Sequence, residues 1–175
     1  KGLPESIIEA AAHTAKEKGK NGWIITLQAP SYVPFMKYCE NRELRRKLYM
    51  AYNTQCIHDN EQNNEDVVKQ LVNLRMQLAQ LLGFKNYADY ALRKRMAENS
   101  ERVYQLLDQL LEAYTPTARE EVKEIEALAQ RTEGKDFQLM PWDFSYYAEK
   151  LKNEKFNLDE EALRPYFELS RVKEG

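Results

Sequence analysis

This 175-residue chain has two histidines, and they are the side chains that could bind a catalytic metal. When a helix carries two histidines one turn apart and a glutamate directly after the first, both imidazoles can bind zinc and the glutamate can act as general base. His13 has neither the second histidine nor the adjacent glutamate, and after His58 the position of the second imidazole is taken by Gln62. We therefore interpret both histidines as surface residues, and we predict no catalytic and no metal-binding residue in this chain.

Other patterns that support catalysis are weaker. The sequence has no Gly-x-Ser-x-Gly turn around a nucleophile and no glycine-rich phosphate loop. The acids between residues 59 and 66 lack the spacing and the central glycine of a calcium loop, and a polar helix start explains them better. Cys39 and Cys56 are the only cysteines, fit no zinc pattern, and are predicted to be buried, reduced thiols.

Aromatic side chains are concentrated near the end of the chain. Seven of the 27 residues from Pro141 to Phe167 are aromatic, and charged residues lie between them. Tyrosine and tryptophan combine a large apolar area with a hydrogen-bonding group, which suits a surface that is buried against something else. These rings could fill a core between the last two helices, or they could form a seam with another part of a larger protein. With the rest of the chain considered, we favour the seam, and we assign no substrate-binding residue.

Five motifs carry a resemblance. They are Gly22–Leu27, Pro30–Met36, Asn41–Arg45, Leu81–Ala88 and the aromatic run that begins at Trp142-Asp143 and ends at Pro165-Tyr166-Phe167. Their order and types resemble the family of zinc metallopeptidases that includes thimet oligopeptidase, neurolysin, oligopeptidase A and bacterial dipeptidyl carboxypeptidase, and are most similar to the last of these. The resemblance implies that zinc is the cofactor of a longer protein, that its binding motif lies downstream of Gly175, and that no zinc binds to this portion.

The bulk composition excludes several classes of protein. The formal net charge is −2, and lysine and arginine nearly balance the acids, so a nucleic-acid partner is not expected. The basic clusters at residues 42–47 and 93–95 have acidic neighbours and are interpreted as solvated helix faces. No apolar stretch approaches the roughly 18 residues that a membrane-spanning helix needs. We expect a cytoplasmic protein, with export left open because the first residue is Lys1 and a leader would lie outside this sequence.

Hydrophobic spacing is helical along nearly the whole chain and predicts a mostly α fold of about seven or eight helices. One predicted helix ends at Gly83. Its core-facing apolar stripe consists of Val67, Leu71, Leu74, Leu78 and Leu81. A second stripe runs from Val103 to Tyr114 behind a Ser100 cap. Thr115-Pro116 is predicted to start a separate helix that Gly134 closes.

Three local features add to this pattern. Residues 22–28 include Trp23 to Leu27, which predict one short β-segment, and Ser31 is predicted to cap the next helix. Asn157 and Glu160 resemble a capping box. No linker or repeat divides the chain, so residues 1–175 are predicted to form a single α-rich fragment, with a candidate sub-boundary near residues 134–141.

Two hypotheses for the function follow. In the first, the chain is a non-catalytic helical portion of a zinc-dependent peptidyl-dipeptidase or oligopeptidase. The longer protein would hydrolyse peptides inside a deep channel, releasing C-terminal dipeptides, and this fragment alone would be inactive. Its partners would be the remainder of the same chain and, through apolar area left exposed, other copies of itself. In the second hypothesis, the chain is a self-contained helical interaction module without enzymatic activity.

Overall fold

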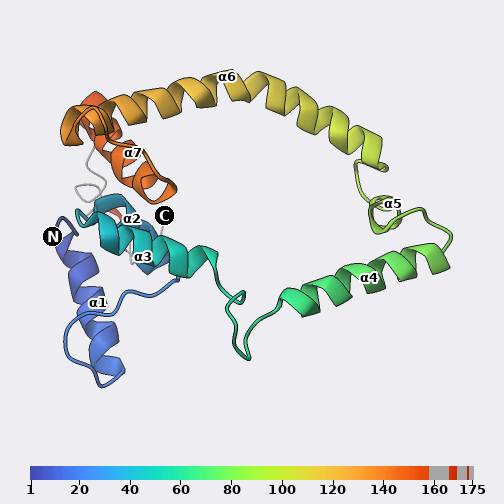
Figure 1. Cartoon of the computed structure of the whole chain (residues 1–175), viewed down its shortest axis with the longest axis horizontal. Helices are drawn as coiled ribbons and strands as arrows, with labels where there is room; N and C mark the ends of the chain where they lie inside the picture. The colour runs from blue at the N-terminus through green and yellow to red at the C-terminus, as the bar shows by residue number, and fades with distance from the viewer. Residues whose placement is uncertain (158–165, 169–172, 174–175) are drawn as a thin grey trace. The chain divides into compact units, whose positions relative to one another are not determined.

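The computed structural model describes residues 1–157, 166–168 and 173. Within these residues it contains seven helices and no β-strand, which confirms the mostly α prediction (Figure 1). The helices are α1 (Glu5–Glu17), α2 (Ala29–Tyr38), α3 (Arg42–Asn53), α4 (Glu65–Leu81), α5 (Tyr87–Leu92), α6 (Ser100–Glu133) and α7 (Pro141–Phe156).

The chain divides into two compact units. Unit 1 consists of residues 1–53 and 123–175 and holds α1, α2, α3, the last part of α6 and α7. Unit 2 consists of residues 54–122 and holds α4, α5 and the first part of α6. Residues 134–141, where a sub-boundary was considered, lie inside unit 1 and connect α6 to α7. Unit 1 is therefore built from two separate stretches of sequence.

The core of unit 1 forms where α7 packs on its neighbours. Ile125 and Ala129 of α6 cluster with Tyr146 and Tyr147 of α7, and all four side chains are buried. Phe137 packs edge-on against Tyr147, with ring centroids 5.6 Å apart. On its other sides α7 contacts α2 and α3. Helix α7 is thus the element that joins the two sequence stretches of unit 1.

The predicted β-segment at residues 22–28 is wrong. Residues 23–26 have no regular secondary structure, and they lie between the turn after α1 and the start of α2. The N–H of Ile24 donates to the carbonyl of Ala11 in α1, at 3.0 Å. The N–H of Thr26 donates to the hydroxyl of Ser31, also at 3.0 Å. These bonds take up backbone groups of the segment without a partner strand, so its β propensity is overridden by tertiary contacts.

One predicted helix start differs from the structure, and a second one is untested because it lies partly outside the described residues. Helix α2 begins at Ala29, so Ser31 lies inside its first turn, and the carbonyl of Gln28 accepts the N–H of Ser31. Asn157 ends α7 in the left-handed conformation, with φ of 48° and its N–H bonded to the carbonyl of Asn153. Asparagine is common both at the cap before a helix and in the left-handed conformation after one, so the sequence alone does not distinguish the two positions. Glu160, the other half of the predicted capping box, lies outside the described residues.

The separate helix predicted at Thr115-Pro116 is wrong as well, because α6 runs without a break from Ser100 to Glu133. Thr115 does not cap a new helix, since its hydroxyl donates back to the carbonyl of Leu111 at 2.5 Å. Side-chain bonds of this kind are compatible with a helix interior. The predicted ends at Gly83 and Gly134 are confirmed, and both glycines have positive φ, 80° and 116°.

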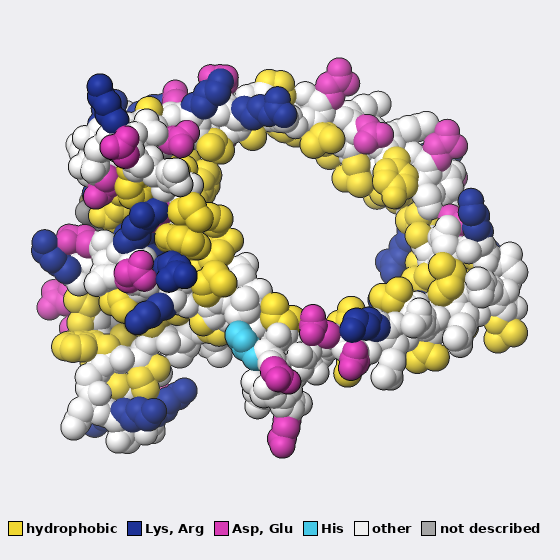
Figure 2. Space-filling model, viewed as in Figure 1, with side chains coloured by type: hydrophobic (Ala, Val, Ile, Leu, Met, Phe, Trp, Pro, Cys, Tyr) yellow, Lys and Arg dark blue, Asp and Glu magenta, His cyan; other side chains and the backbone are white. Residues whose placement is uncertain are grey.

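Unit 2 buries little of its apolar surface. The stripe of α4 that was predicted to face a core is exposed, from 42% at Leu78 to 84% at Leu81, and Ala79 is the buried residue of this helix. The first part of α6 is similar, with Leu106 at 57% and Leu111 at 67% exposed. Figure 2 shows these apolar side chains on the surface along both helices. The stripes were predicted correctly as helical faces, but no described residue covers them.

Candidate functional site

The histidines and cysteines are not brought together into a site. His13 is exposed on α1, with Nδ1 3.7 Å from the carboxylate of Glu17. His58 is exposed in the connection between α3 and α4, with Nε2 3.2 Å from the hydroxyl of Thr54. Both histidines are surface residues, as predicted. Cys39 is buried and free, as predicted, but Cys56 is free and exposed, so that part of the cysteine prediction is wrong.

A dense group of interacting side chains lies between α3 and α7 and centres on Asp143. This carboxylate is fully buried, and it accepts hydrogen bonds from two arginines of α3. Arg42 donates through Nη2 at 2.7 Å and through Nε at 3.1 Å, and Arg45 donates through Nη2 at 2.8 Å. We call Arg42, Arg45 and Asp143 the arginine clamp. The hydrogen bond to Asp143 raises the pKa of Arg42 above its usual value.

Arg45 is the most deeply buried cation of the clamp, with 1% of its surface exposed. Its Nη1 donates to the backbone carbonyls of Cys39 and Glu40, and its Nε donates to the carbonyl of Trp142. The guanidinium also lies over the ring of Tyr146, 4.1 Å from the centroid. Every nitrogen of the side chain therefore has a partner, which is the condition under which a buried charge is tolerated.

The clamp is a structural joint between α3 and α7. A general base must reach the proton that it takes up, but Asp143 is fully buried and both its oxygens accept hydrogen bonds from guanidinium groups. The side chain of Arg42 is 41% exposed, whereas Arg45 is buried with all its nitrogens bonded. What the clamp positions is a pair of helices: it holds α3 and α7 against each other.

A second set of polar contacts fixes the rest of α7. The hydroxyl of Tyr147 donates to Glu133 at the end of α6, at 2.9 Å. Burial and this hydrogen bond raise the pKa of Tyr147 above its usual value of 10.0. Glu149 is buried and accepts from Lys37 of α2 at 3.2 Å and from Lys152 at 2.7 Å. Together with the clamp, these contacts tie α7 to α2, α3 and α6.

The aromatic block divides between the two interpretations that the sequence left open. Tyr146 and Tyr147 fill the core, and Trp142 packs edge-on against Tyr49 of α3 at 6.1 Å. In contrast, Phe144 is 41% exposed and Phe156 is 71% exposed. The first half of α7 is thus mainly core, while single rings on its other face stay open to solvent.

The clamp differs from the prediction, in which Arg42 and Arg45 belong to a solvated helix face. Arg45 is buried, so that interpretation is wrong for this residue, while residues 93–95 are exposed as predicted. The signal that could have revealed the clamp is chemical. Asp143 stands between aromatic residues in a segment predicted to be buried, and a buried carboxylate requires a cation.

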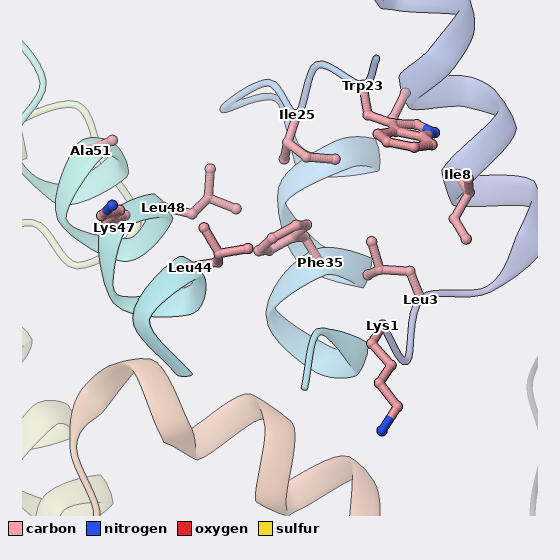
Figure 3. A pocket seen from close by; sticks show the side chains of 11 residues that line it. Lys1, Leu3, Ile8, Trp23, Ile25, Phe35, Leu44, Lys47, Leu48 and Ala51 are labelled. Carbon is pink, nitrogen blue, oxygen red and sulfur yellow. The ribbon is translucent and has the colours of Figure 1, made fainter. Parts of the chain in front are cut away.

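Unit 1 also has an apolar pocket of about 550 Å³, which we call the unit 1 pocket (Figure 3). Side chains from the start of the chain, from residues 23–25, from α2 and from α3 point into it. The lining residues are Lys1, Leu3, Ile8, Ala11, Trp23, Ile25, Phe35, Leu44, Lys47, Leu48 and Ala51. Trp23 remains 68% exposed at its edge. Apart from Lys1 and Lys47 this lining is apolar, which suits an apolar segment.

Comparison with known proteins places the chain in a family. Residues 35–175 match the protein family described as Peptidase family M3, and this match covers most of the chain. The chain therefore belongs to peptidase family M3.

Curated relatives match the chain over almost its entire length. Oligopeptidase A of Haemophilus influenzae is 40% identical over 178 residues, which are 99% of this chain and 26% of that protein. Oligopeptidase A of Escherichia coli is 39% identical with the same coverage. Dipeptidyl carboxypeptidase of Escherichia coli is 35% identical over 172 residues, 98% of this chain and 25% of that protein. The chain thus spans about a quarter of the length of these relatives.

The described residues do not fit the zinc that the resemblance implies. A zinc site in a peptidase needs three protein ligands, usually two histidines and a carboxylate. No group of three or more His, Cys, Asp and Glu side chains in the described part of the chain could hold a metal ion. The buried carboxylate of Asp143 is already bound by two guanidinium groups.

Of the described helices, none is long and apolar enough to cross a membrane.

Proposed function

We propose that this chain is a non-catalytic, helical portion of a zinc-dependent peptidase of family M3, located before the zinc-binding helix of a longer protein. The observation that carries this proposal is the coverage: 99% of the chain aligns with 26% of the length of oligopeptidase A. The arginine clamp supports it, because Asp143, a fully buried polar residue, holds two helices together instead of facing a substrate.

The reaction of the longer protein would be zinc-assisted hydrolysis of peptides in a deep channel, and this portion would form part of the channel wall. The sequence motifs favoured release of C-terminal dipeptides. Identity is somewhat higher with the oligopeptidase A relatives, 40% and 39%, than with dipeptidyl carboxypeptidase, 35%. We therefore propose cleavage within oligopeptides. A peptide with an amidated C-terminus separates the two modes, because a dipeptide-releasing enzyme requires the free terminal carboxylate.

The first partner of this portion would be the remainder of the same longer chain. Exposed apolar surfaces of the kind that a further part of a protein usually buries support this proposal. The unit 1 pocket is lined almost entirely by apolar side chains, and Trp23 at its edge is 68% exposed. Patches of this kind larger than a few hundred Å² are unusual on proteins that act alone. The same surfaces argue against the alternative function, a self-contained interaction module with an evenly polar exterior.

The free thiols of Cys39 and Cys56 support a reducing compartment, such as the cytoplasm.

Two measurements on the chain test this proposal. The purified chain is incubated with zinc and a fluorogenic peptide, with a full-length oligopeptidase A as the positive control. We expect no turnover and less than one bound zinc per chain by elemental analysis after dialysis. Stoichiometric zinc together with hydrolysis would overturn the proposal. A dye that fluoresces on apolar surfaces should bind strongly, whereas a module with a polar exterior would leave the dye dark.

A further inference from the structure

The loop that follows α1 contains the one Asn-Gly pair of the chain, Asn21-Gly22. Both ends of this loop are bonded to backbone carbonyls of α1, through the N–H of Lys20 at 2.9 Å and the N–H of Ile24 at 3.0 Å. Among the described residues, none bonds to the N–H groups of residues 21–23 or to the side chain of Asn21. Asn21 and Gly22 are both exposed. The loop is therefore fixed at its ends and unbonded between them.

An asparagine that is followed by glycine can convert to an acid without an enzyme. The backbone nitrogen of the glycine attacks the side-chain carbonyl carbon of the asparagine, and the new C–N bond closes a five-membered succinimide ring. The proton of that nitrogen passes through water to the amide nitrogen of the side chain, which leaves as ammonia. A water molecule then opens the ring at one of its two carbonyls. The products are aspartate and isoaspartate, in which the main chain runs through the former side-chain carbon.

The local structure around Asn21 meets the requirements of this reaction. Gly22 has φ of 94°, and a Cβ added to it would meet no atom within 4 Å, so the space beside the attacking nitrogen is open. No hydrogen bond has to break when this nitrogen turns toward Asn21. Lys20 directly precedes the pair, and its positive charge favours the deprotonated nitrogen that attacks.

We propose that Asn21 is a site of spontaneous deamidation, with water as the second reactant and ammonia as the leaving group. This modification is a property of the chain and does not rest on the proposed peptidase function.

The next best candidate, Asn99, is held in place by the fold. It precedes Ser100, whose side chain is smaller than those that follow the remaining asparagines. However, Oδ1 of Asn99 accepts the N–H of Arg102 at 2.9 Å, in the manner of a cap at the start of α6. This bond must break before the side chain can turn toward the nitrogen of Ser100. Asn99 is therefore the internal reference against which the rate at Asn21 is measured.

Conversion of Asn21 changes the edge of the unit 1 pocket. Trp23 lies on the same loop, lines the pocket and is 68% exposed (Figure 3). Either product places a negative charge beside Lys20. Isoaspartate also adds one carbon to the main chain between the two bonded ends of the loop. We expect this longer loop to loosen the hydrogen bond of Ile24 to α1 and to displace Trp23 at the pocket.

Peptide mapping of the folded chain after incubation in mildly alkaline buffer tests the site. Cleavage after the glutamates releases residues 18–40, in which Asn21 is the one asparagine. We expect Asn21 to convert at least about 10-fold faster than Asn99, which corresponds to a barrier lower by about 1.4 kcal/mol. Mass spectrometry should show two products of equal mass, and chromatography should separate them. An Asn21 that stays intact as long as Asn99 would overturn the proposal.

Two variants test the chemistry. Gly22→Ala adds a Cβ beside the attacking nitrogen and should slow the conversion at least about 10-fold. Because alanine is strained at φ of 94°, Asn21→Gln is the second variant, and its longer side chain would have to close a six-membered ring. It should also slow the loss of ammonia from residue 21 at least about 10-fold. Unchanged rates in both variants would rule out attack by the nitrogen of Gly22.

Unfolding the chain in guanidinium chloride tests whether the fold leaves Asn21 unprotected. The rate at Asn21 should change less than about 3-fold, while the rate at Asn99 should rise by more than that, since its capping bond is lost. An increase of more than about 10-fold at Asn21 would mean that the folded loop prevents the attack. That result would contradict the open geometry of the loop.

Hydrogen exchange of the purified isoaspartate form tests the effect on the pocket edge. The amide of Ile24 should exchange at least about 3-fold faster than in the unaltered chain, because its bond to α1 is loosened. Asn21→Asp is the matched control, since it carries the charge without the extra carbon, and its exchange should stay within about 2-fold. Equal exchange in all three forms would overturn the predicted displacement of the loop.

Discussion

Asp143 illustrates how a single carboxylate can organise a joint between helices. It is buried, it neutralises Arg45, and the two side chains come from positions 98 residues apart in the sequence. A buried ion pair adds little net stability relative to well-packed apolar groups, but removing one partner leaves an uncompensated charge. The clamp therefore makes the structure sensitive to the loss of either charge.

Asp143→Asn should lower the free energy of unfolding by about 3–5 kcal/mol, because the guanidinium of Arg45 would remain buried without its carboxylate. Urea denaturation followed by circular dichroism measures this change. The matched control is Glu154→Gln, which breaks the exposed pair of Glu154 with Arg131. That change should cost less than about 1 kcal/mol. Equal effects of the two variants would mean that the clamp does not hold α3 to α7.

Tyr147 supplies a pH-dependent contribution at the junction of α6 and α7. Its pKa in the folded state is raised above the usual 10.0, so the folded chain holds the phenol proton more tightly than the unfolded chain does. The stability from this group is complete below about pH 10 and is lost as the pH rises above that value. The loss begins when the unfolded chain starts to ionise at this position.

Tyr147→Phe removes both the hydrogen bond to Glu133 and the titration. Below pH 10 the variant should be less stable than the unaltered chain by about 1 kcal/mol. Above pH 10 the difference should shrink, because only the unaltered chain loses stability through residue 147. Urea denaturation of both chains from pH 8 to 11 checks this, and the other tyrosines cancel in the comparison. A difference that grows above pH 10 would contradict the assigned pKa direction.

At the scale of elements, α6 shows where local sequence signals reach their limit. Thr115-Pro116 is typical of a helix start, and nothing nearby in the sequence indicates otherwise. The structure nevertheless continues the helix through Pro116, although proline supplies no N–H and its ring crowds the carbonyl one turn earlier. Continuity depends on the stretches before and after residue 116, which a local motif does not describe.

Pro116→Ala should therefore stabilise the chain by about 2 kcal/mol, since alanine restores the hydrogen bond and part of the gain is offset by a more flexible unfolded chain. Thermal unfolding followed at 222 nm measures the change. Pro30→Ala is the control, because Pro30 lies in the first turn of α2, where an N–H has no partner within the helix. That change should stay within about 0.5 kcal/mol. A less helical Pro116→Ala variant would contradict the continuous helix.

At the scale of the whole molecule, sequence could predict the helical fold and the family, because periodicity and collinear motifs are properties of the sequence itself. It could not predict that Arg45 is buried, because the partner of this residue lies on a distant helix. The exposure of the apolar stripe of α4 was not predicted either. Hydrophobic spacing indicates which face of a helix needs a cover, but it does not say whether the cover belongs to the same chain.

The division of unit 1 into two stretches also has a consequence for synthesis. Arg45 leaves the ribosome almost one hundred residues before Asp143, and unit 2 is made in between. At a synthesis rate of roughly 5–20 residues per second, Asp143 is added about 5–20 s after the arginines of α3 that it neutralises. During that interval Arg42 and Arg45 lack the carboxylate that binds them, and α7 completes the unit once it has been synthesised.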